Sequence, residues 1–188
     1  MRILIAALLG AIAMFVWTSI AHTMTPLGQI GFSQIPNEAP VLAAMQDSIG
    51  GTSGLYFYPW VDPKDPKMME KQAAAEKSGP HGLLLYHPAG QDLDSDMAPM
   101  LVKEFVKQLI QALAAATVIS LLAATTYFTR WGAVVLMFVS SSIATNVSYW
   151  TWYRFPLDYT CAQIVIELVS GIVAGAVIAW WMGRGKTA

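Results

Sequence analysis

The sequence has little charge and almost no cysteine. Only 12% of its 188 residues are charged, about half the share of about 25% in soluble globular proteins. The formal net charge of −1 argues against a nucleic-acid partner, which favours a basic surface. The single cysteine, Cys161, cannot form a disulfide within the chain or a cysteine-based zinc cage. Because it begins an apolar run, we expect a buried small side chain rather than a lipidated or redox-active thiol.

Sequence motifs that carry catalysis are also missing. The chain has no glycine-rich phosphate loop, no GxSxG elbow and no HExxH metal motif, and no nucleophile and base stand at a spacing that defines a site. These absences favour a protein that is not an enzyme and has no cofactor. The activity itself is not evident from the sequence.

Apolar residues, in contrast, make up 55% of the chain and dominate its C-terminal part. Three apolar runs follow one another at 105–127, 131–149 and 160–182. About 20 apolar residues cross a ~30 Å hydrocarbon core as a helix, and in lipid only a helix or a closed barrel satisfies its own backbone polar groups. We therefore predict an integral membrane protein whose direct partner is the lipid bilayer.

The N-terminus predicts a fourth membrane helix at 1–21. After Arg2, residues 3–20 are apolar except for Thr18 and Ser19. The end of this run also fits a signal-peptide cleavage site, so a cleaved leader is the alternative. The length of the run and Trp17, a typical interface anchor, favour an uncleaved signal anchor.

Basic residues indicate the orientation of these helices. With the N-terminus inside the cell, the short tail 183–188 is cytoplasmic and residues 22–104 lie outside. The basic residues then inside are Arg2, Arg130, Arg184 and Lys186, and those outside near helix ends are Lys103, Lys107 and Arg154. The excess of basic residues on the inside is therefore small. The signal-like N-terminus is what favours a chain with both ends inside the cell (N-in, C-in).

The segment 22–104 predicts a small α/β domain. It holds ten of the twelve acidic residues and is too long for a structureless loop. We expect a helix at 39–48 with Asn37 as its N-cap and a helix from Asp65, its N-cap, to Lys77. Two short strands are expected at 54–58 and 82–86, and their similar sequences favour pairing. The fold class is thus a four-helix membrane bundle with an extracytoplasmic α/β domain between helices 1 and 2.

Two strands alone are marginal in water, so the outer domain needs a cover from its helices, the membrane bundle or a partner. Its aromatic side chains fit a docking surface, but a core for the domain is favoured; they are Tyr56, Phe57, Tyr58 and Trp60.

A metal site in this segment is only weakly indicated. The alternation of Asp92, Asp94 and Asp96 opens like a calcium loop, but Met97 and Lys103 stand where the turn glycine and the closing glutamate are needed. The alternative is a solvated acidic linker in which Asp96 caps the next helix. His81 and His87 lack a third ligand, so we expect no metal.

Polar residues of the four predicted helices lie at a similar height, in the outer third of the membrane. They are Thr18 and His22 on the first helix, Gln108 and Gln111 on the second, Ser142, Thr145 and Asn146 on the third, and Gln163 and Glu167 on the fourth.

Glu167 is the most informative member of this layer. A carboxylate about 10 Å below the start of its helix costs about 2–3 kcal/mol or more unless it is paired or hydrated. We expect it to point into the bundle, within reach of Asn146, Gln111 or Ser142. It is interpreted as a polar clamp that fixes helix register, as a hydrated ion, proton or ligand site, or as part of a contact with another subunit. Gly171 and Gly175 form a small-xxx-small motif that packs either the monomer or a homo-oligomer.

Four stretches of the chain resemble an uncharacterised family of small bacterial inner-membrane proteins. They are HTMTPLG at 22–28, IPNE at 35–38, GLYFYP at 54–59 and GPHGLLLYHP at 79–88, and the similarity covers roughly residues 15–90. The resemblance implies a bacterial inner-membrane setting and carries over no catalytic residue.

Two functions are therefore favoured over a third, a membrane-embedded enzyme, which has the least support. The first is an accessory or assembly subunit whose outer domain binds a membrane or periplasmic partner, as the small size and the aromatic outer segment indicate. The second is a small transporter or channel component with its polar site around Glu167. Because four helices are few for a transporter, that function needs a homo-oligomer.

Overall fold

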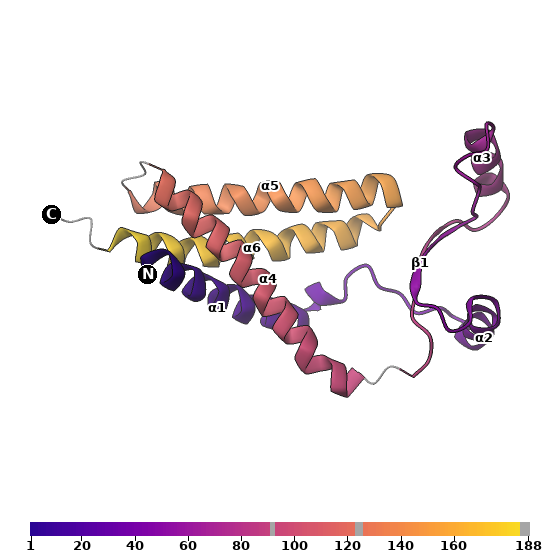
Figure 1. Cartoon of the computed structure of the whole chain (residues 1–188), viewed down its shortest axis with the longest axis horizontal. Coiled ribbons are helices and arrows are strands. Elements are labelled where there is room, and N and C mark those ends of the chain that lie inside the picture. The colour runs from indigo at the N-terminus through magenta and orange to yellow at the C-terminus, as the bar shows by residue number, and fades with distance from the viewer. Residues whose placement is uncertain (91–92, 123–125, 185–188) are drawn as a thin grey trace. The chain divides into compact units, whose positions relative to one another are not determined.

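The computed structural model describes residues 1–90, 93–122 and 126–184, and the chain forms two compact units (Figure 1). The first, the helical unit, comprises Met1–Phe32 and Leu93–Ala188. The second, Ser33–Asp92, contains the short elements. The chain is mostly helical, and the predicted mixed α/β composition of the inserted segment is present.

Within the described ranges, four helices of the helical unit are long and apolar enough to cross a membrane. They are α1 (Arg2–Thr23), α4 (Leu93–Leu121), α5 (Tyr127–Tyr153) and α6 (Leu157–Gly183). A helix of 27 residues, such as α5 or α6, is about 40 Å long, which exceeds the ~30 Å hydrocarbon core.

The helix ends differ from the predicted apolar runs. Helix α4 begins at Leu93 rather than at 105, because hydropathy marks where a helix becomes apolar and not where it starts. Asp96 therefore lies inside α4, and its predicted role as an N-cap is wrong. Helix α5 begins four residues before the predicted 131, where the Thr126 hydroxyl accepts a hydrogen bond from the Thr129 amide. Residues 123–125 of the predicted run 105–127, and residues 185–188 of the predicted tail, lie outside the described residues.

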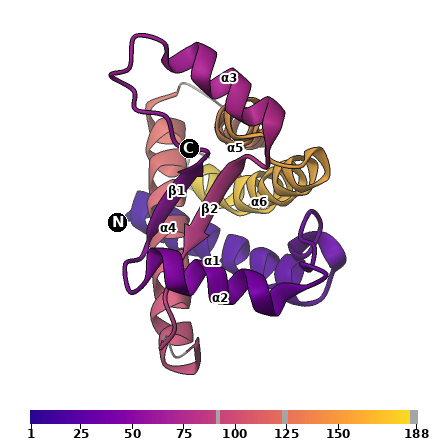
Figure 2. The ribbon, with the colours of Figure 1, turned by 90° about the vertical axis from the view of Figure 1, so that its right-hand side faces the viewer.

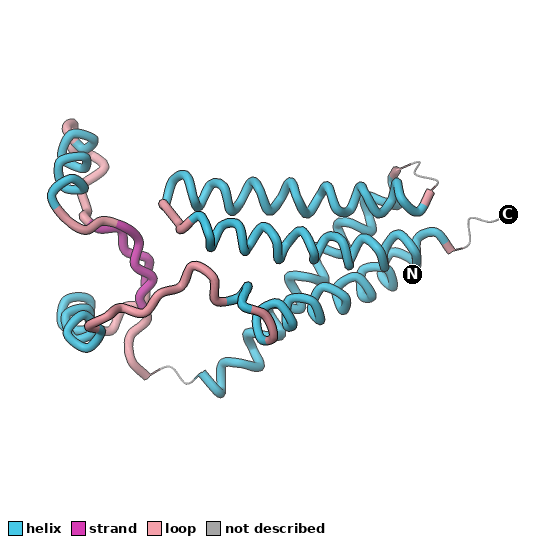
Figure 3. Tube along the Cα trace, turned by 180° about the vertical axis from the view of Figure 1, so that it is seen from behind, coloured by secondary structure: helices cyan, strands magenta, loops and turns pink. Residues whose placement is uncertain are grey.

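Alanine side chains form the centre of the helical unit. Helix α1 packs against both α4 and α6, and α6 packs against α5, as Figure 3 shows for the adjacent helices α5 and α6. The fully buried alanines let α1 and α4 approach closely, as small residues do at helix interfaces in lipid. Among them are Ala6, Ala11, Ala112, Ala115 and Ala116, each 0% exposed.

The indole N–H groups of two tryptophans donate hydrogen bonds to backbone carbonyls of α6. Trp17 on α1 donates from Nε1 to the Ile166 carbonyl at 2.9 Å. Trp131 on α5 donates from Nε1 to the Ile172 carbonyl at 3.2 Å. Helix α6 is thus hydrogen-bonded both to α1 and to α5.

Gly171 and Gly175 lie where α6 meets α5. A Cβ atom on Gly171 would be 2.6 Å from the Cβ of Phe138, and one on Gly175 would be 3.2 Å from the Trp131 carbonyl oxygen. The small-xxx-small motif therefore packs α6 against α5 within the chain. Cys161 on α6 is exposed, so its predicted burial is wrong: the helix turns this position away from α1 and α5.

The second unit contains α2 (Glu38–Ile49), β1 (Gly54–Tyr58), α3 (Met68–Ser78) and β2 (Gly82–Tyr86). The strands pair antiparallel from Gly54↔Tyr86 to Tyr58↔Gly82, which confirms the predicted pairing. Figure 2 shows the two strands side by side, with α2 near one end of the sheet and α3 near the other. Asp65 does not cap α3, which begins at Met68; its side chain accepts from the Lys67 amide in the preceding turn.

This unit is smaller than the predicted domain 22–104. Residues up to Phe32 belong to the helical unit, because a 3-10 turn at Pro26–Gly28 packs on α1 and the Phe32 ring contacts the Tyr159 ring of α6 at 5.6 Å. At the other end, α4 already includes 93–104.

Ser33–Asp92 has almost no interior. Of its described residues only Tyr86 is buried; its hydroxyl donates to the Gly50 carbonyl at 2.9 Å. Neither helix packs extensively on the strands, because each stands near an end of the sheet rather than over a face. Tyr58 and Trp60 are 42% and 70% exposed, so the interpretation of all four aromatics as a core is wrong.

Candidate functional site

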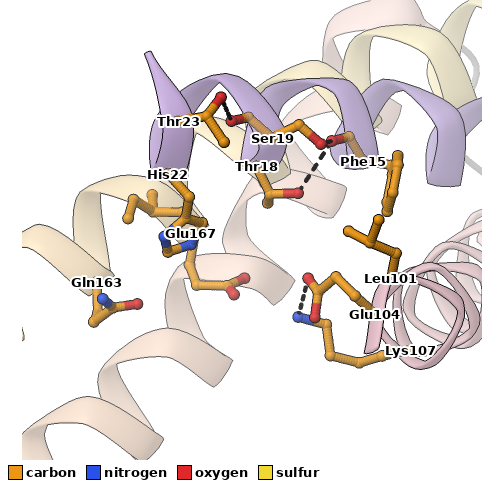
Figure 4. A pocket seen from close by; sticks show the side chains of 11 residues that line it. Phe15, Thr18, Ser19, His22, Thr23, Leu101, Glu104, Lys107, Gln163 and Glu167 are labelled. Carbon is orange, nitrogen blue, oxygen red and sulfur yellow. Dashed lines mark hydrogen bonds and ion pairs between the residues drawn. The ribbon is translucent and has the colours of Figure 1, made fainter. Parts of the chain in front are cut away.

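Polar side chains of three helices line an open pocket in the helical unit. The pocket has a volume of about 390 Å³ and is formed by α1, α4 and α6 (Figure 4). Its residues recur at helical spacing, such as 15, 18, 19 and 22 on α1, which places them on one helix face. The lining is Phe15, Thr18, Ser19, His22, Thr23, Leu101, Glu104, Lys107, Gln163, Ile166 and Glu167.

A buried amide connects α1 to α4 beside this pocket. Gln108 is 1% exposed, and its Nε2 donates to the Thr18 hydroxyl and to the Glu104 carboxylate, each at 2.9 Å. The Glu104 carboxylate accepts hydrogen bonds, so this assignment of Nε2 is required by its partner. Gln108 Oε1 has no hydrogen-bond partner within the described part of the chain. A buried acceptor of this kind is normally satisfied by an ordered water.

Three charged side chains define the electrostatics of the pocket. Glu104 and Lys107 form an ion pair at 2.7 Å, one helical turn apart on α4. Glu167 on α6 is half-buried, and its carboxylate points toward that pair; Lys107 and Glu104 are the charges that act on it. With two carboxylates and one ammonium, the lining has a formal charge of −1.

Glu167 itself faces the open space of the pocket. Among the described residues its carboxylate has no hydrogen-bond partner, which leaves room for water or a ligand. A negatively charged pocket with one unengaged carboxylate can bind a proton, a small cation or an amine.

The predicted polar layer divides into two groups. Thr18, His22, Gln163 and Glu167 come together around the pocket, with Gln108 directly behind it.

On α5, Asn146 instead donates from Nδ2 to the carbonyl and hydroxyl oxygens of Ser142 on its own helix, at 3.0 and 3.2 Å. Thr145 is exposed, and Gln111 is half-buried outside the pocket lining. The predicted contacts of Glu167 with Asn146, Gln111 or Ser142 are therefore wrong. Residues at one height point into different interfaces, because α6 lies between α1 and α5.

Comparisons with known proteins assign no function to the pocket, so its function is inferred from its geometry. No family model, curated protein or solved structure matches this chain. The resemblance to small bacterial inner-membrane proteins stays a prediction.

The candidate metal ligands do not form a site among the residues that the structure describes. No group of three or more His, Cys, Asp and Glu side chains is arranged around a common point there. Asp92 and the side chain of Asp94 lie outside the described residues. Asp96 is in a helical turn, whereas a calcium loop wraps its ligands around the ion in non-helical backbone. His81 and His87 flank β2.

Glu104 and Lys107 are the site residues that the sequence analysis did not select. The predicted apolar run begins at 105, which places Glu104 in the outer domain and Lys107 at the helix end. Their spacing of three residues, with Gln108 four residues after Glu104, is the helical pattern of an ion pair and a hydrogen-bond pair. This spacing is the feature of the sequence from which the interactions of Glu104 could have been predicted.

Proposed function

We propose that this chain is a non-enzymatic integral membrane protein, an accessory or assembly subunit whose unit Ser33–Asp92 binds a partner protein. The observation that carries the proposal is the apolar face of its two-stranded sheet. Leu55 pairs with Leu85 and Phe57 with Leu83 across the strands. Leu55 and Leu85 are 66% and 69% exposed. We call these four residues the sheet face.

The energetics favour a cover for the sheet face. Full burial of a leucine or phenylalanine contributes roughly 1.5–3 kcal/mol, and a two-stranded sheet without a cover is marginal in water. Leu55 and Leu85 are exposed and Phe57 and Leu83 are half-buried, and adjoining apolar side chains that remain accessible to solvent mark protein interaction sites. Open strand edges add backbone donors and acceptors for a partner strand. A partner that covers the face therefore stabilises the unit as it binds.

For the membrane arrangement we propose the N-in, C-in topology in a bacterial inner membrane, with Ser33–Asp92 in the periplasm. Arg2, Arg130 and Arg184 stand at the helix ends that this topology places inside, which supports it. Burial of Ala6 and Ala11 in the centre of the helical unit supports an uncleaved α1, because cleavage would remove that packing surface.

The test combines purification with a surface variant. The tagged full chain is purified from its native membrane in mild detergent, and co-purifying proteins are quantified by mass spectrometry. We expect one stoichiometric partner that is lost in the double variant Leu55→Ser/Leu85→Ser. The matched control is Met69→Ser, which changes a residue that is 75% exposed on α3 and away from the sheet face.

Photocrosslinking locates the contact. A photoreactive amino acid at position 85 should crosslink the same partner, and one at position 69 should not. A chain that purifies alone as a homo-oligomer refutes the accessory role. A partner that stays bound to the double variant refutes the sheet face as its site.

A second candidate function is supported by the pocket: a transporter or channel component that carries a proton or small cation past Glu167. The supporting observation is the carboxylate that faces open space beside the Glu104–Lys107 ion pair. The full chain in proteoliposomes is assayed for proton, Na⁺ and K⁺ flux, with Glu167→Gln as the test variant. Asp158→Asn, an acidic residue of α6 outside the lining, is the control. Flux that is absent, or equal in Glu167→Gln and wild type, excludes this function.

A further inference from the structure

The hydroxyl groups that line the pocket beside Glu167 are arranged to accept hydrogen bonds rather than to donate them. Ser19 of α1 donates from its hydroxyl to the Phe15 carbonyl at 2.7 Å, and Thr23 donates to the Ser19 carbonyl at 2.7 Å (Figure 4). Thr18 likewise donates to the Phe15 carbonyl, at 3.2 Å. Because a hydroxyl has a single hydrogen, its oxygen lone pairs are left to accept. The α1 wall of the pocket is therefore a row of acceptors.

The charges of the lining also favour a ligand that donates. The Glu104 carboxylate accepts from the Lys107 ammonium at 2.7 Å and from Gln108 Nε2 at 2.9 Å, so its charge is balanced within α4. Glu167 on α6 accepts no hydrogen bond from the part of the chain that the structure describes. The pocket thus keeps one unbalanced negative charge. Because a carboxylate inside a membrane helix is costly unless it is paired, this charge selects a monocation.

Apolar side chains and a fixed backbone complete the pocket. Phe15, Leu101 and Ile166 belong to its lining. The Phe15 ring stands edge-on to the Phe105 ring, with the centroids 5.6 Å apart. Trp17 donates to the carbonyl of Ile166, the residue before Glu167, at 2.9 Å. The carboxylate and the apolar wall are therefore held in place before a ligand binds, which lowers the entropy lost on binding.

The volume of the pocket indicates an organic ligand. About 390 Å³ is many times the roughly 10–15 Å³ that one water requires, and it lies within the range of small-molecule pockets, about 300–1,000 Å³. A metal ion without its water shell would instead need several oxygen ligands around one point. Within the described ranges, no group of three or more His, Cys, Asp and Glu side chains is arranged in this way.

We propose that this pocket binds a primary ammonium group attached to an apolar body, with the ammonium on Glu167 and the apolar body against Phe15 and Ile166. A primary ammonium has three N–H donors and no acceptor, which matches a carboxylate beside hydroxyl acceptors. The inference rests on the second candidate function, because it names the class of substrate for the same pocket. A soluble amine and the headgroup of an aminophospholipid share this chemistry.

Isothermal titration calorimetry of the full chain in mild detergent at pH 7 tests the inference. The probes are 2-phenylethylamine, which is protonated at this pH, 2-phenylethanol as its neutral analogue, and methylamine as an ammonium without an apolar body. We expect 2-phenylethylamine to bind, and the other two to bind about tenfold more weakly or less. Equal binding of 2-phenylethylamine and 2-phenylethanol, or of the two amines, overturns the inference.

Two variants of the lining should change the affinity in opposite directions. Glu167→Gln keeps the shape of the side chain but removes its charge, and should weaken binding of 2-phenylethylamine by about tenfold or more. Lys107→Gln removes the cation that balances Glu104, and should strengthen binding by about threefold. This gain cannot result from a fold that is disturbed by the substitution.

The matched control is Asp158→Asn, which removes an exposed carboxylate in the first turn of α6, outside the pocket lining. It should bind 2-phenylethylamine as wild type does. Unchanged binding in Glu167→Gln, or binding that is not tighter in Lys107→Gln, contradicts the proposal.

Native mass spectrometry of the full chain distinguishes the two sources of the ammonium. Phosphatidylethanolamine that is retained by wild type and lost from Glu167→Gln identifies a lipid headgroup. Phosphatidylcholine, whose ammonium has no N–H donor, should not be retained, and equal retention of both lipids overturns the assignment of a primary ammonium. Binding of 2-phenylethylamine without retention of phosphatidylethanolamine identifies a soluble amine.

The flux assay separates this inference from the transport function. Binding of 2-phenylethylamine without its flux in proteoliposomes refutes transport and supports the binding site. Flux of protons, Na⁺ or K⁺ in a chain that binds none of the amines or aminophospholipids refutes the inference and leaves the transport function standing.

Discussion

Gly171→Ala should disturb the packing of α5 against α6. The added Cβ would stand 2.6 Å from Phe138 Cβ, against about 3.5–4.0 Å for an ordinary contact between carbon atoms. A Cβ atom moves only with its backbone, so the helices must separate by about 1 Å. Overpacking of this kind typically costs about 1–3 kcal/mol. Part of this cost is offset because alanine in place of glycine stabilises a helix by about 0.5–1 kcal/mol. We therefore expect a net loss of about 1–2 kcal/mol in the free energy of unfolding.

The same helix pair supplies the control. Gly132 on α5 has no atom within 4 Å of its added Cβ, so Gly132→Ala should leave stability unchanged or slightly increased. The assay is thermal unfolding of the full chain in mild detergent, followed by far-UV circular dichroism. Gly171→Ala should unfold roughly 3–6 °C below Gly132→Ala. Equal midpoints for the two variants would show that Gly171 does not lie at a close helix contact.

Three further predictions concern single residues. Gly31→Ala should lower the free energy of unfolding of the helical unit by more than about 2 kcal/mol, because the residue has φ +88° and its added Cβ would lie 2.3 Å from the Cβ of Tyr159 on α6. In the same thermal assay, Gly50→Ala in the other unit has open space around the added Cβ but should still cost about 1–3 kcal/mol, because φ +71° and ψ −136° is a backbone conformation that favours glycine. Trp17→Phe should lower the free energy of unfolding by about 0.6 kcal/mol, because the hydrogen bond to the Ile166 carbonyl of α6 is lost. An unchanged unfolding midpoint would show that this bond contributes nothing to stability.

The pKa of Asp65 is lowered because the Lys71 ammonium and the backbone N–H of residue 67 hydrogen-bond to its carboxylate. That contact is present above the ordinary carboxyl pKa and is lost as the pH falls through the lowered value. Lys71→Gln should raise the Asp65 pKa toward its ordinary value in an NMR titration, and an unchanged pKa would contradict the assigned cause.

Much of the candidate site could be predicted from helix periodicity and depth. Thr18, Gln108, Gln163 and Glu167 are predicted site residues because a polar side chain inside a membrane helix is energetically costly and usually has a function. The structure places these four at or beside one pocket. Ser142 and Asn146 satisfied the same criterion and form a separate pair on α5. Depth alone does not give the direction in which a side chain points around its helix.

The amino-acid sequence by itself determined which segments become helices and strands and which helices can cross a membrane. Local patterns suffice there, because the length of apolar runs, alternation and turn residues act over a few neighbouring residues. Only the tertiary structure decided that Glu104 and Lys107 lie near Glu167, and that the side chains of Leu55 and Leu85 stay exposed. Glu104 and Lys107 are 63 and 60 positions before Glu167 in the chain, and their proximity depends on how whole helices pack, which no local pattern encodes.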